Sequence, residues 1–323
     1  MVLISQRIFL ETIKKYCLAR SIAVEVRSGG WLVIMTKGRR RRLAIGYDIG
    51  LNSAVAHQVA NDKSACAEVL ASAGVPAIAH TLFLGGRLSK HIPGSDSLEA
   101  MRLLLDQHPR GLVVKPNEGT SGELVFRVTT RAQLEAAVAR ILAAHPSLAI
   151  SPYVEIEHEV RVVLLDAHAL IVYGKTRPMV VGDGIHSLRA LAQASATAEQ
   201  LKTLPEDFDA AALDAIPPAG ERLLLNWRHN LDAGAEPMLI ADDATRDACT
   251  ALAIKAAQAV GIRFASIDVV RADGAWKVLE VKSGVKMEAL GRRHPALVEA
   301  AYHAALDAVF EQVGRPGESR DDG

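Results

Sequence analysis

The stretch Val113-Val114-Lys115-Pro116-Asn117-Glu118-Gly119-Thr120-Ser121-Gly122 joins an apolar segment to a loop of small residues. Lys115 stands near the end of the predicted strand, where a side chain reaches the rim of a sheet. The loop offers backbone N–H groups with little side-chain bulk, a pattern suited to covering phosphate oxygens. Taken alone, the loop is equally compatible with an ordinary hairpin turn, because the chain has no Gly-x-x-x-x-Gly-Lys-Ser/Thr sequence.

A second stretch places two carboxylates on neighbouring predicted strands, Ile267-Asp268-Val269 and Leu279-Glu280-Val281-Lys282. If the connecting loop has three residues, Asp268 lies directly opposite Glu280, whereas a two-residue loop puts them on opposite faces. Facing like charges destabilise a sheet, so such a pair is expected where a cation lies between the carboxylates. Mg²⁺ prefers one or two carboxylates together with substrate phosphates.

Composition narrows the class of protein. The chain has 323 residues, of which 50% are apolar, enough for more than one core. Lys+Arg and Asp+Glu are equal at 37 each, so no global field favours nucleic acid or an anionic membrane, and we expect neither partner. The basic run at residues 39–42 favours a solvated hairpin turn.

Cellular location is predicted from what the sequence lacks. No apolar run approaches the length of a membrane span, and residues 1–20 have the pattern of an amphipathic helix instead of a secretion signal. The three cysteines are scattered and form no Cys-x-x-Cys, which favours a reducing cytoplasm and buried thiols.

Helices and strands interleave along the chain, and several strand pairs are hairpin-like. This pattern predicts an α+β fold with a mixed or antiparallel sheet. We expect a small N-terminal domain at residues 1–60, a second unit at 61–150, a third at 151–313 and a disordered tail at 314–323. Predicted helices cover residues 62–73, 130–144, 243–260 and 296–313, with an alanine-rich helical stretch at 187–215.

The order of these motifs resembles the ATP-grasp fold, in which two α+β halves clamp ATP and a carboxylate is ligated to an amine. The resemblance covers about residues 60–310. It implies ATP and Mg²⁺ as cofactors, with Asp268 and Glu280 as metal ligands and Arg161 facing the phosphates. The residues that it implies for nucleotide binding are Lys63, Lys115, Thr120, Ser121, Gly122, the backbone N–H of Val154, and Glu159 at the ribose.

Two further segments narrow the resemblance. Val180-Val181-Gly182-Asp183-Gly184 followed by Leu188-Arg189 resembles cyanophycin synthetases and glutathione-type ligases. Arg228-His229-Asn230-Leu231 followed by Gly234 resembles ribosomal-protein glutamate ligases. This resemblance implies that Arg228 stabilises the transferred phosphoryl group and the tetrahedral oxyanion that follows. It also implies that Asn230 orients the acyl group. A homodimer is compatible with this resemblance.

Two positions depart from the family pattern. Lys282 stands where the third metal ligand is usually asparagine, and an ammonium has no lone pair to offer a metal. It could contact a phosphate directly, serve the substrate with a lowered pKa, or mark the loss of turnover. Ser151-Pro152 stand where an acidic residue often begins the adenine contact, and the spacing to Glu159 is one residue longer than usual.

We therefore expect an ATP-dependent carboxylate–amine ligase that forms an amide or peptide bond through an acyl phosphate, on an amino acid or small peptide. One alternative is an ATP-binding pseudoenzyme or regulatory module, indicated by Lys282. Another is a carboxylate–thiol ligase or carboxylate kinase, which uses the same intermediate. Lys175 and Arg177 receive a minor expected role in holding a substrate carboxylate.

Overall fold

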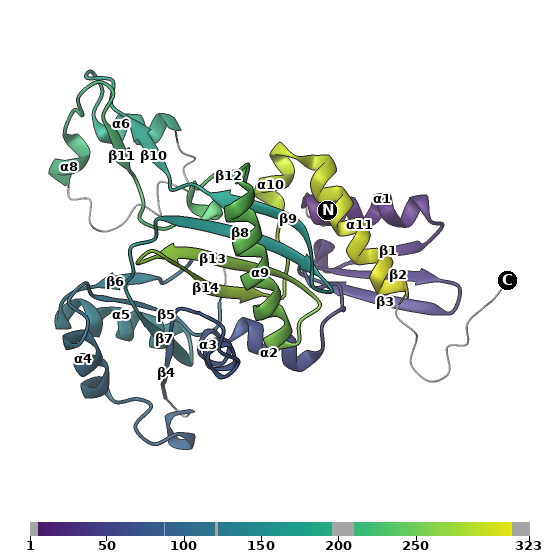
Figure 1. Cartoon of the computed structure of the whole chain (residues 1–323), viewed down its shortest axis with the longest axis horizontal. Helices are drawn as coiled ribbons and strands as arrows, with labels where there is room; N and C mark the ends of the chain where they lie inside the picture. Colours follow the sequence, from purple (N-terminus) through teal and green to yellow (C-terminus); the bar gives the residue numbers. More distant parts are fainter. Residues whose placement is uncertain (1–5, 87, 120–121, 196–209, 312–323) are drawn as a thin grey trace.

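The computed structural model describes residues 6–86, 88–119, 122–195 and 210–311, and Figure 1 shows how its elements are arranged. The strands form sheets of five, four, three and two strands, and the paired strands run antiparallel. The expected α+β architecture with antiparallel sheets is therefore confirmed. Among the described residues, no helix is both long and apolar enough to cross a membrane.

The five-stranded sheet is the centre of the molecule, with the strand order β12-β9-β8-β13-β14 (Figure 1). Its strands are β8 (His158–Leu165), β9 (His168–Lys175), β12 (Pro237–Leu239), β13 (Phe264–Ala272) and β14 (Ala275–Lys282). Alternate side chains enter different cores because they point to opposite faces. Val163 and Phe264 lie in one core, whereas Val162 and Ala265 lie in the other.

Helices cover both faces of this sheet. One face packs against α2 (Ala54–Asn61), α3 (Lys63–Ser72) and α9 (Asp243–Val260). The other packs against α1 (Ile8–Ala19), α10 (Glu288–Arg293) and α11 (Pro295–Glu311). Only part of the second face is apolar, and beyond Val163 and Tyr173 its residues become charged.

The N-terminal sheet consists of β1 (Ala23–Arg27), β2 (Leu32–Lys37) and β3 (Arg40–Ile45), with the short 3₁₀ helix η1 (Ser28–Gly30) between the first two. Its inner face shares the core of α1, α10 and α11. Residues from the two ends of the chain thus form one core, which places the N-terminal segment against the central sheet and not on a linker.

The four-stranded sheet carries the lysine and the glycine loop. Its order is β4-β7-β5-β6, with β4 (Thr81–Leu84), β5 (Leu112–Pro116), β6 (Phe126–Val128) and β7 (Ser147–Pro152). One face packs against α4 (Leu98–Asp106) and α5 (Arg131–Ala144), and η2 (Leu88–His91) lies between β4 and α4. Leu112 and Val114 enter this core, so Lys115 points to the opposite face of the sheet.

A small lobe lies beside β12 (Figure 1). It contains β10 (Met179–Val181), β11 (Arg222–Leu224), α6 (Leu188–Ser195) and α8 (Ala210–Asp214), and η3 (Leu231–Ala233) follows it. The predicted helical stretch at 187–215 corresponds to α6 and α8. Its central part at 196–209, Thr120, Ser121 and the tail at 314–323 lie outside the described residues.

Local sequence signals explain the element boundaries. The side chain of Asp62 caps α3, and Thr130 with Gln133 forms the predicted capping box of α5. Helix α9 spans the predicted residues and ends at Gly261, whose φ of 70° suits glycine. The three cysteines are free and buried, and burial raises the pKa of the Cys66 thiol to about 12.

The β13–β14 hairpin has the shorter of the two turns that the sequence left open. Ala272 pairs with Ala275, so the loop has two residues, Asp273-Gly274, and both have positive φ. This is the geometry that Asp-Gly favours in a two-residue hairpin. Of the two loop lengths that the sequence left open, the structure has the shorter one, which by itself would have separated the two carboxylates.

A β-bulge restores their opposition. Val269 pairs with Val278, whereas the next residue, Asp268, pairs with Glu280, so Leu279 is the extra residue of the bulge. Asp268 and Glu280 are therefore directly opposite each other, as predicted, although for a different reason.

Candidate active site

The two predicted carboxylates lie in a cluster of buried and half-buried charges on the second face of the central sheet, beyond the part that packs against α1 and α11. Asp268 accepts two hydrogen bonds from Arg161, at 2.7 and 2.8 Å, and lies 3.0 Å from the ammonium of Lys175. Lys175 also pairs with Glu159, which is its cross-strand partner in β8. All four side chains are buried.

Burial and ion pairing have opposite effects on the pKa values of Asp268 and Glu159. Burial alone would raise the pKa of Asp268, but the guanidinium of Arg161 and the ammonium of Lys175 hold it well below its usual range. At Glu159 burial prevails, so its pKa is raised even though Lys175 is in contact with it. Asp268 is thus a permanent anion, and Glu159 is the carboxylate of this group that gains a proton more readily.

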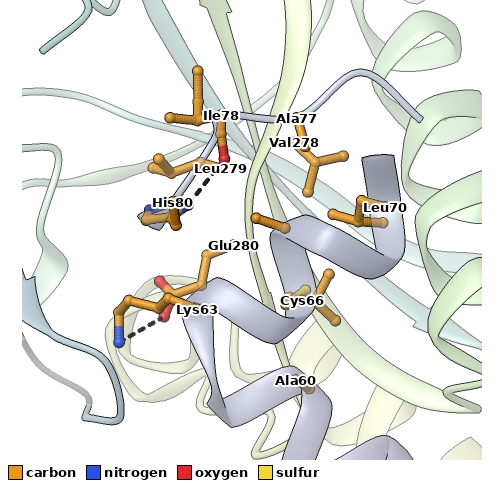
Figure 2. A pocket seen from close by; sticks show the side chains of 12 residues that line it. Ala60, Lys63, Cys66, Leu70, Ala77, Ile78, His80, Val278, Leu279 and Glu280 are labelled. Carbon is orange, nitrogen blue, oxygen red and sulfur yellow. Dashed lines mark hydrogen bonds and ion pairs between the residues drawn. The ribbon is translucent and has the colours of Figure 1, made fainter. Parts of the chain in front are cut away.

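Glu280 forms the second half of the cluster. Its carboxylate pairs with Lys282 and lies 3.9 Å from Lys63, as Figure 2 shows for the Lys63 contact. Burial would raise the pKa of Glu280, but Lys282 and Lys63 together lower it to about 2. In Figure 2 His80 lies beside this pair, above the start of α3.

Lys115 enters the cluster from the other sheet. Burial lowers its pKa to about 8, with Glu280 partly offsetting the effect. Its ammonium has no hydrogen-bond or ion-pair partner within the described ranges.

We define the ionic cluster as eight residues: Lys63, Lys115, Arg161, Lys175, Lys282, Glu159, Asp268 and Glu280. Five cations and three carboxylates leave an excess of two positive charges. A buried excess of this sign is a site for an anion, because unpaired charge is costly in a low-dielectric environment.

The glycine loop lies against this cluster. The ammonium of Lys63 donates to the carbonyls of Asn117 and Gly119 at 3.3 and 3.1 Å. At the other end of the loop, Arg228 donates to the carbonyl of Gly122 at 2.9 Å. A Cβ on Gly122 would lie 2.5 Å from the side-chain nitrogen of Asn230, so only glycine fits there. The loop, Arg228 and Asn230 are therefore brought together.

Val154 and Glu159, the two remaining residues predicted to contact the nucleotide, lie in different surroundings from each other. Val154 follows β7 in an irregular segment, and within the described ranges its backbone N–H has no hydrogen-bond partner. Glu159 was expected at a ribose, but its carboxylate lies inside the ionic cluster, between Lys175 and His229.

Three residues that the sequence reasoning gave little or no weight lie in or beside the cluster. Lys175 bridges Glu159 and Asp268, and the register of the β8–β9 hairpin was the signal that could have revealed it. His229 is buried 3.6 Å from Glu159, and burial lowers its pKa to about 4. His80 is buried with its Nδ1 2.9 Å from the carbonyl of Ile78, and no local sequence pattern marks it.

Asp268 and Glu280 differ in how well they could bind a magnesium ion. The described ranges contain no group of three or more His, Cys, Asp or Glu side chains arranged to hold a metal. Both oxygens of Asp268 are engaged by Arg161, whereas Glu280 is partly exposed and, within the described part of the chain, pairs with Lys63 and Lys282. The donors therefore fit one divalent ion shared with phosphate oxygens at Glu280, and not a metal centre made by the protein alone.

A large cavity opens next to the cluster, with a volume of about 1040 Å³. Its inner end is lined by Glu159, Lys175 and His229, and it extends past β12 to the β10–β11 lobe and α10. The cavity gives a substrate direct access to the buried charges.

The chain was compared with known proteins by sequence and by structure. No protein-family model matches the chain, and no curated protein matches it in sequence. Solved structures do match: a bifunctional glutathione synthetase from Pasteurella multocida has a TM-score of 0.51 and 16% identity, covering 91% of this chain and 44% of that protein.

Two structures of D-alanine–D-alanine ligase from Bacillus anthracis match as well. One has a TM-score of 0.52 and 16% identity, covering 80% of this chain and 69% of the ligase. The other, a complex with ATP, has a TM-score of 0.51 and 14% identity, covering 81% and 72%. The chain spans less than half of the synthetase and about 70% of the ligase. The predicted resemblance is confirmed at the level of architecture: this chain has the ATP-grasp fold.

Proposed function

We propose that the protein is an ATP-dependent carboxylate–amine ligase that forms an amide or peptide bond and releases ADP and phosphate. The observation that carries the proposal is the ionic cluster, with its excess of positive charge and with Lys115, which has no ion-pair partner among the described residues, at the end of the strand that leads into the glycine loop. A polyphosphate is the common metabolite whose charge and length suit such a site.

The proposed reaction has two steps. A substrate carboxylate oxygen attacks the γ-phosphorus of ATP, the P–O bond to ADP breaks, and an acyl phosphate forms. The amine then attacks the acyl carbon, the C–O bond to phosphate breaks, and the amine nitrogen loses a proton. Positioning and charge neutralisation supply most of the catalysis in such phosphoryl transfers.

The residues of this chain have distinct roles in the proposal. Lys63 and Lys115 neutralise phosphate charge, and Arg161 fixes Asp268 in place. Arg228, held against Gly122, stabilises the transferred phosphoryl group and the oxyanion of the second step, while Asn230 orients the acyl group. A bound Mg²⁺, held by phosphate oxygens and Glu280, would add further charge neutralisation; Asp268 becomes a ligand only if Arg161 releases one of its oxygens.

The amine must lose its proton before or during its attack. Glu159 is suited to accept it, because its pKa is raised by burial and it lines the inner end of the cavity. His229 lies beside it with a lowered pKa and stays neutral at neutral pH, so it adds no repelling charge near an incoming ammonium.

Phosphate release from ATP, measured with pools of carboxylates in the presence and absence of amines, tests the proposal. Release that requires both substrates supports ligation. Formation of ADP with a carboxylate alone, without release of phosphate, supports a carboxylate kinase. Phosphate release that depends on a thiol supports a carboxylate–thiol ligase.

One observation favours a second function, ATP binding without turnover. Lys282 contacts Glu280, and both oxygens of Asp268 are engaged, so the carboxylates are already neutralised by the protein. Lys282→Asn separates the two functions. A gain in phosphate release identifies Lys282 as the cause of lost turnover, whereas a loss identifies it as a working part of the ligase.

A further inference from the structure

The cavity beside the ionic cluster is larger than a single amino acid requires. Its volume of about 1040 Å³ lies at the upper end of the range for sites that enclose drug-sized ligands, roughly 300–1,000 Å³. A free amino acid would leave most of it filled with water. The cavity is therefore dimensioned for a substrate of several residues.

One wall of the cavity is an open sheet edge. Strand β12 is the outermost strand of the five-stranded sheet and pairs only with β9 among the described elements. Thr176 N–H donates to the carbonyl of Glu236 at 3.0 Å, which makes these two a hydrogen-bonded pair. Because such pairs alternate along an antiparallel ladder, the backbone groups of Pro237 and Leu239 point away from β9.

This edge is equipped to receive an extended chain. The carbonyl of Pro237 and the N–H and carbonyl of Leu239 are available to a new strand, and proline places its missing donor on the open side. The side chains of Met238 and Leu239 are 55% and 46% exposed, so a chain lying here would cover apolar surface. Unpaired edges of this kind bind peptides by strand addition.

The charged side chains that line the cavity indicate which kind of peptide it would bind. Most cationic side chains that line the cavity have an acidic partner: Arg293 pairs with Glu236 at 2.7 Å, and Arg271 lies 3.5 Å from Glu157. Among the described residues, Arg222 on β11 and Arg292 on α10 have no acidic partner. Both line the cavity, on elements outside the sheet.

We propose that the cavity binds an extended acidic peptide, which adds to the open edge of β12 while its carboxylate side chains contact Arg222 and Arg292. Lys175 at the inner end then meets the carboxyl group that reacts. This inference deepens the proposed ligase function by naming the substrate class, and it depends on that function only for the reaction at the inner end.

Binding is tested by fluorescence anisotropy without nucleotide. The probes are a fluorescein-labelled octapeptide of alternating valine and glutamate, the same peptide with glutamine in place of glutamate, and free glutamate as a competitor. We expect the acidic peptide to bind more tightly than the neutral one, and free glutamate not to displace it at equal concentration. Equal binding of the two peptides, or no binding of either, would overturn the proposal.

Variants identify the contacts. Arg222→Gln and Arg292→Gln are each expected to weaken the acidic peptide by about fivefold, the upper range for an exposed ion pair, and to leave the neutral peptide unchanged. Arg189→Gln is the control for net charge, because it removes one positive charge from α6 in the β10–β11 lobe, outside the cavity, where this arginine pairs with Asp214. An equal loss of affinity for the acidic peptide in all three variants would mean that only net charge matters. This result would overturn the assignment of Arg222 and Arg292 as peptide contacts.

The backbone contact has its own pair of variants. Leu239→Pro removes the outward N–H, whereas Leu239→Ala keeps it, so only the first is expected to weaken both peptides. If the proline variant melts at a lower temperature, peptides methylated at alternate backbone nitrogens make the same test from the ligand side. Unchanged binding of the methylated peptides would exclude strand addition. Because these measurements use no ATP, their failure is distinguishable from a failure of the ligase proposal.

Discussion

At the scale of single residues, Asp268 is the most constrained side chain of the site. It is 2% exposed and accepts a bidentate pair from Arg161. Asp268→Asn leaves two buried cations with reduced compensation, and we expect a loss of about 3–5 kcal/mol in the free energy of unfolding, measured by urea denaturation.

A matched pair on the surface provides the control for Asp268→Asn. Asp166 makes the same two-pronged contact with Arg263, at 2.7 and 2.8 Å, but both side chains are about 40% exposed. Asp166→Asn is expected to cost less than about 1 kcal/mol. Equal losses for the two variants would contradict the role given to burial in the cluster.

Lys115 gives the site a pH dependence. Its pKa is about 8 in the nucleotide-free protein, and a bound polyphosphate favours the charged form and raises it. The ammonium is present below this pKa and is lost above it, so the affinity for ATP falls as the pH rises from about 7 to about 9. Titration calorimetry at both pH values measures the change.

Lys115→Arg keeps its charge over this range, because an arginine is not deprotonated in proteins. Its affinity for ATP is therefore expected to vary less with pH than that of the unmodified protein. The same slope in both proteins would mean that another group causes the dependence.

Among the helices and strands, the ends of elements were predicted well wherever a capping residue or a glycine marks them in the sequence. Asp62, the Thr130–Gln133 capping box and Gly261 marked helix ends that the structure has within a residue or two. The hairpin between β13 and β14 was harder, because Asp273-Gly274 fixes the turn but not the bulge at Leu279.

The bulge did leave a trace in the sequence. In a regular strand, residues of one face are two apart, yet Val278 and Val281 enter the same core although they are three apart. A break of this kind is visible as a pattern only once the core is known. Long-range partners such as Arg161 with Asp268 have no local signal, and their meeting depends on the order of the strands.

The contact between the glycine loop and the Arg228 segment is testable by adding one methyl group. Gly122→Ala places a Cβ 2.5 Å from the side chain of Asn230 at a φ of +74°, so we expect the segment to move and phosphate release to fall at least about tenfold. Gly274→Ala has the same φ of +74° but nothing within 4 Å of the new atom. It should lower stability by about 1 kcal/mol and leave activity unchanged. Loss of activity in both variants would show that backbone strain alone is responsible.

At the scale of the whole molecule, the two ends of the chain stabilise each other. Glu288 on α10 accepts hydrogen bonds from the N–H groups of Ile8 and Phe9, at 2.8 and 3.2 Å, and from the hydroxyl of Tyr47 at 3.2 Å. A carboxylate from the far end of the sequence thus serves the N-terminus of α1. The sequence predicted a small N-terminal domain at residues 1–60, and no local pattern in it indicated this contact with Glu288.

Glu288→Ala removes this contact and is expected to lower the free energy of unfolding by about 1–3 kcal/mol in urea denaturation, because buried N–H groups lose their acceptor. Glu299→Ala is the control, since Glu299 joins α11 to Lys15 of α1 by a surface ion pair of 2.9 Å. That pair is expected to contribute less than about 1 kcal/mol. Similar losses would mean that Glu288 acts only as one more surface charge.

The proposed function requires that the ionic cluster bind a nucleoside triphosphate, and this binding is measured by calorimetric titration of ATP in the presence of Mg²⁺. We predict saturable binding to the unmodified protein, weakened about tenfold or more in Lys115→Met, because a charge-assisted contact is lost while the fold is retained. Absence of binding to the folded, unmodified protein would show that the ionic cluster is not a nucleotide site.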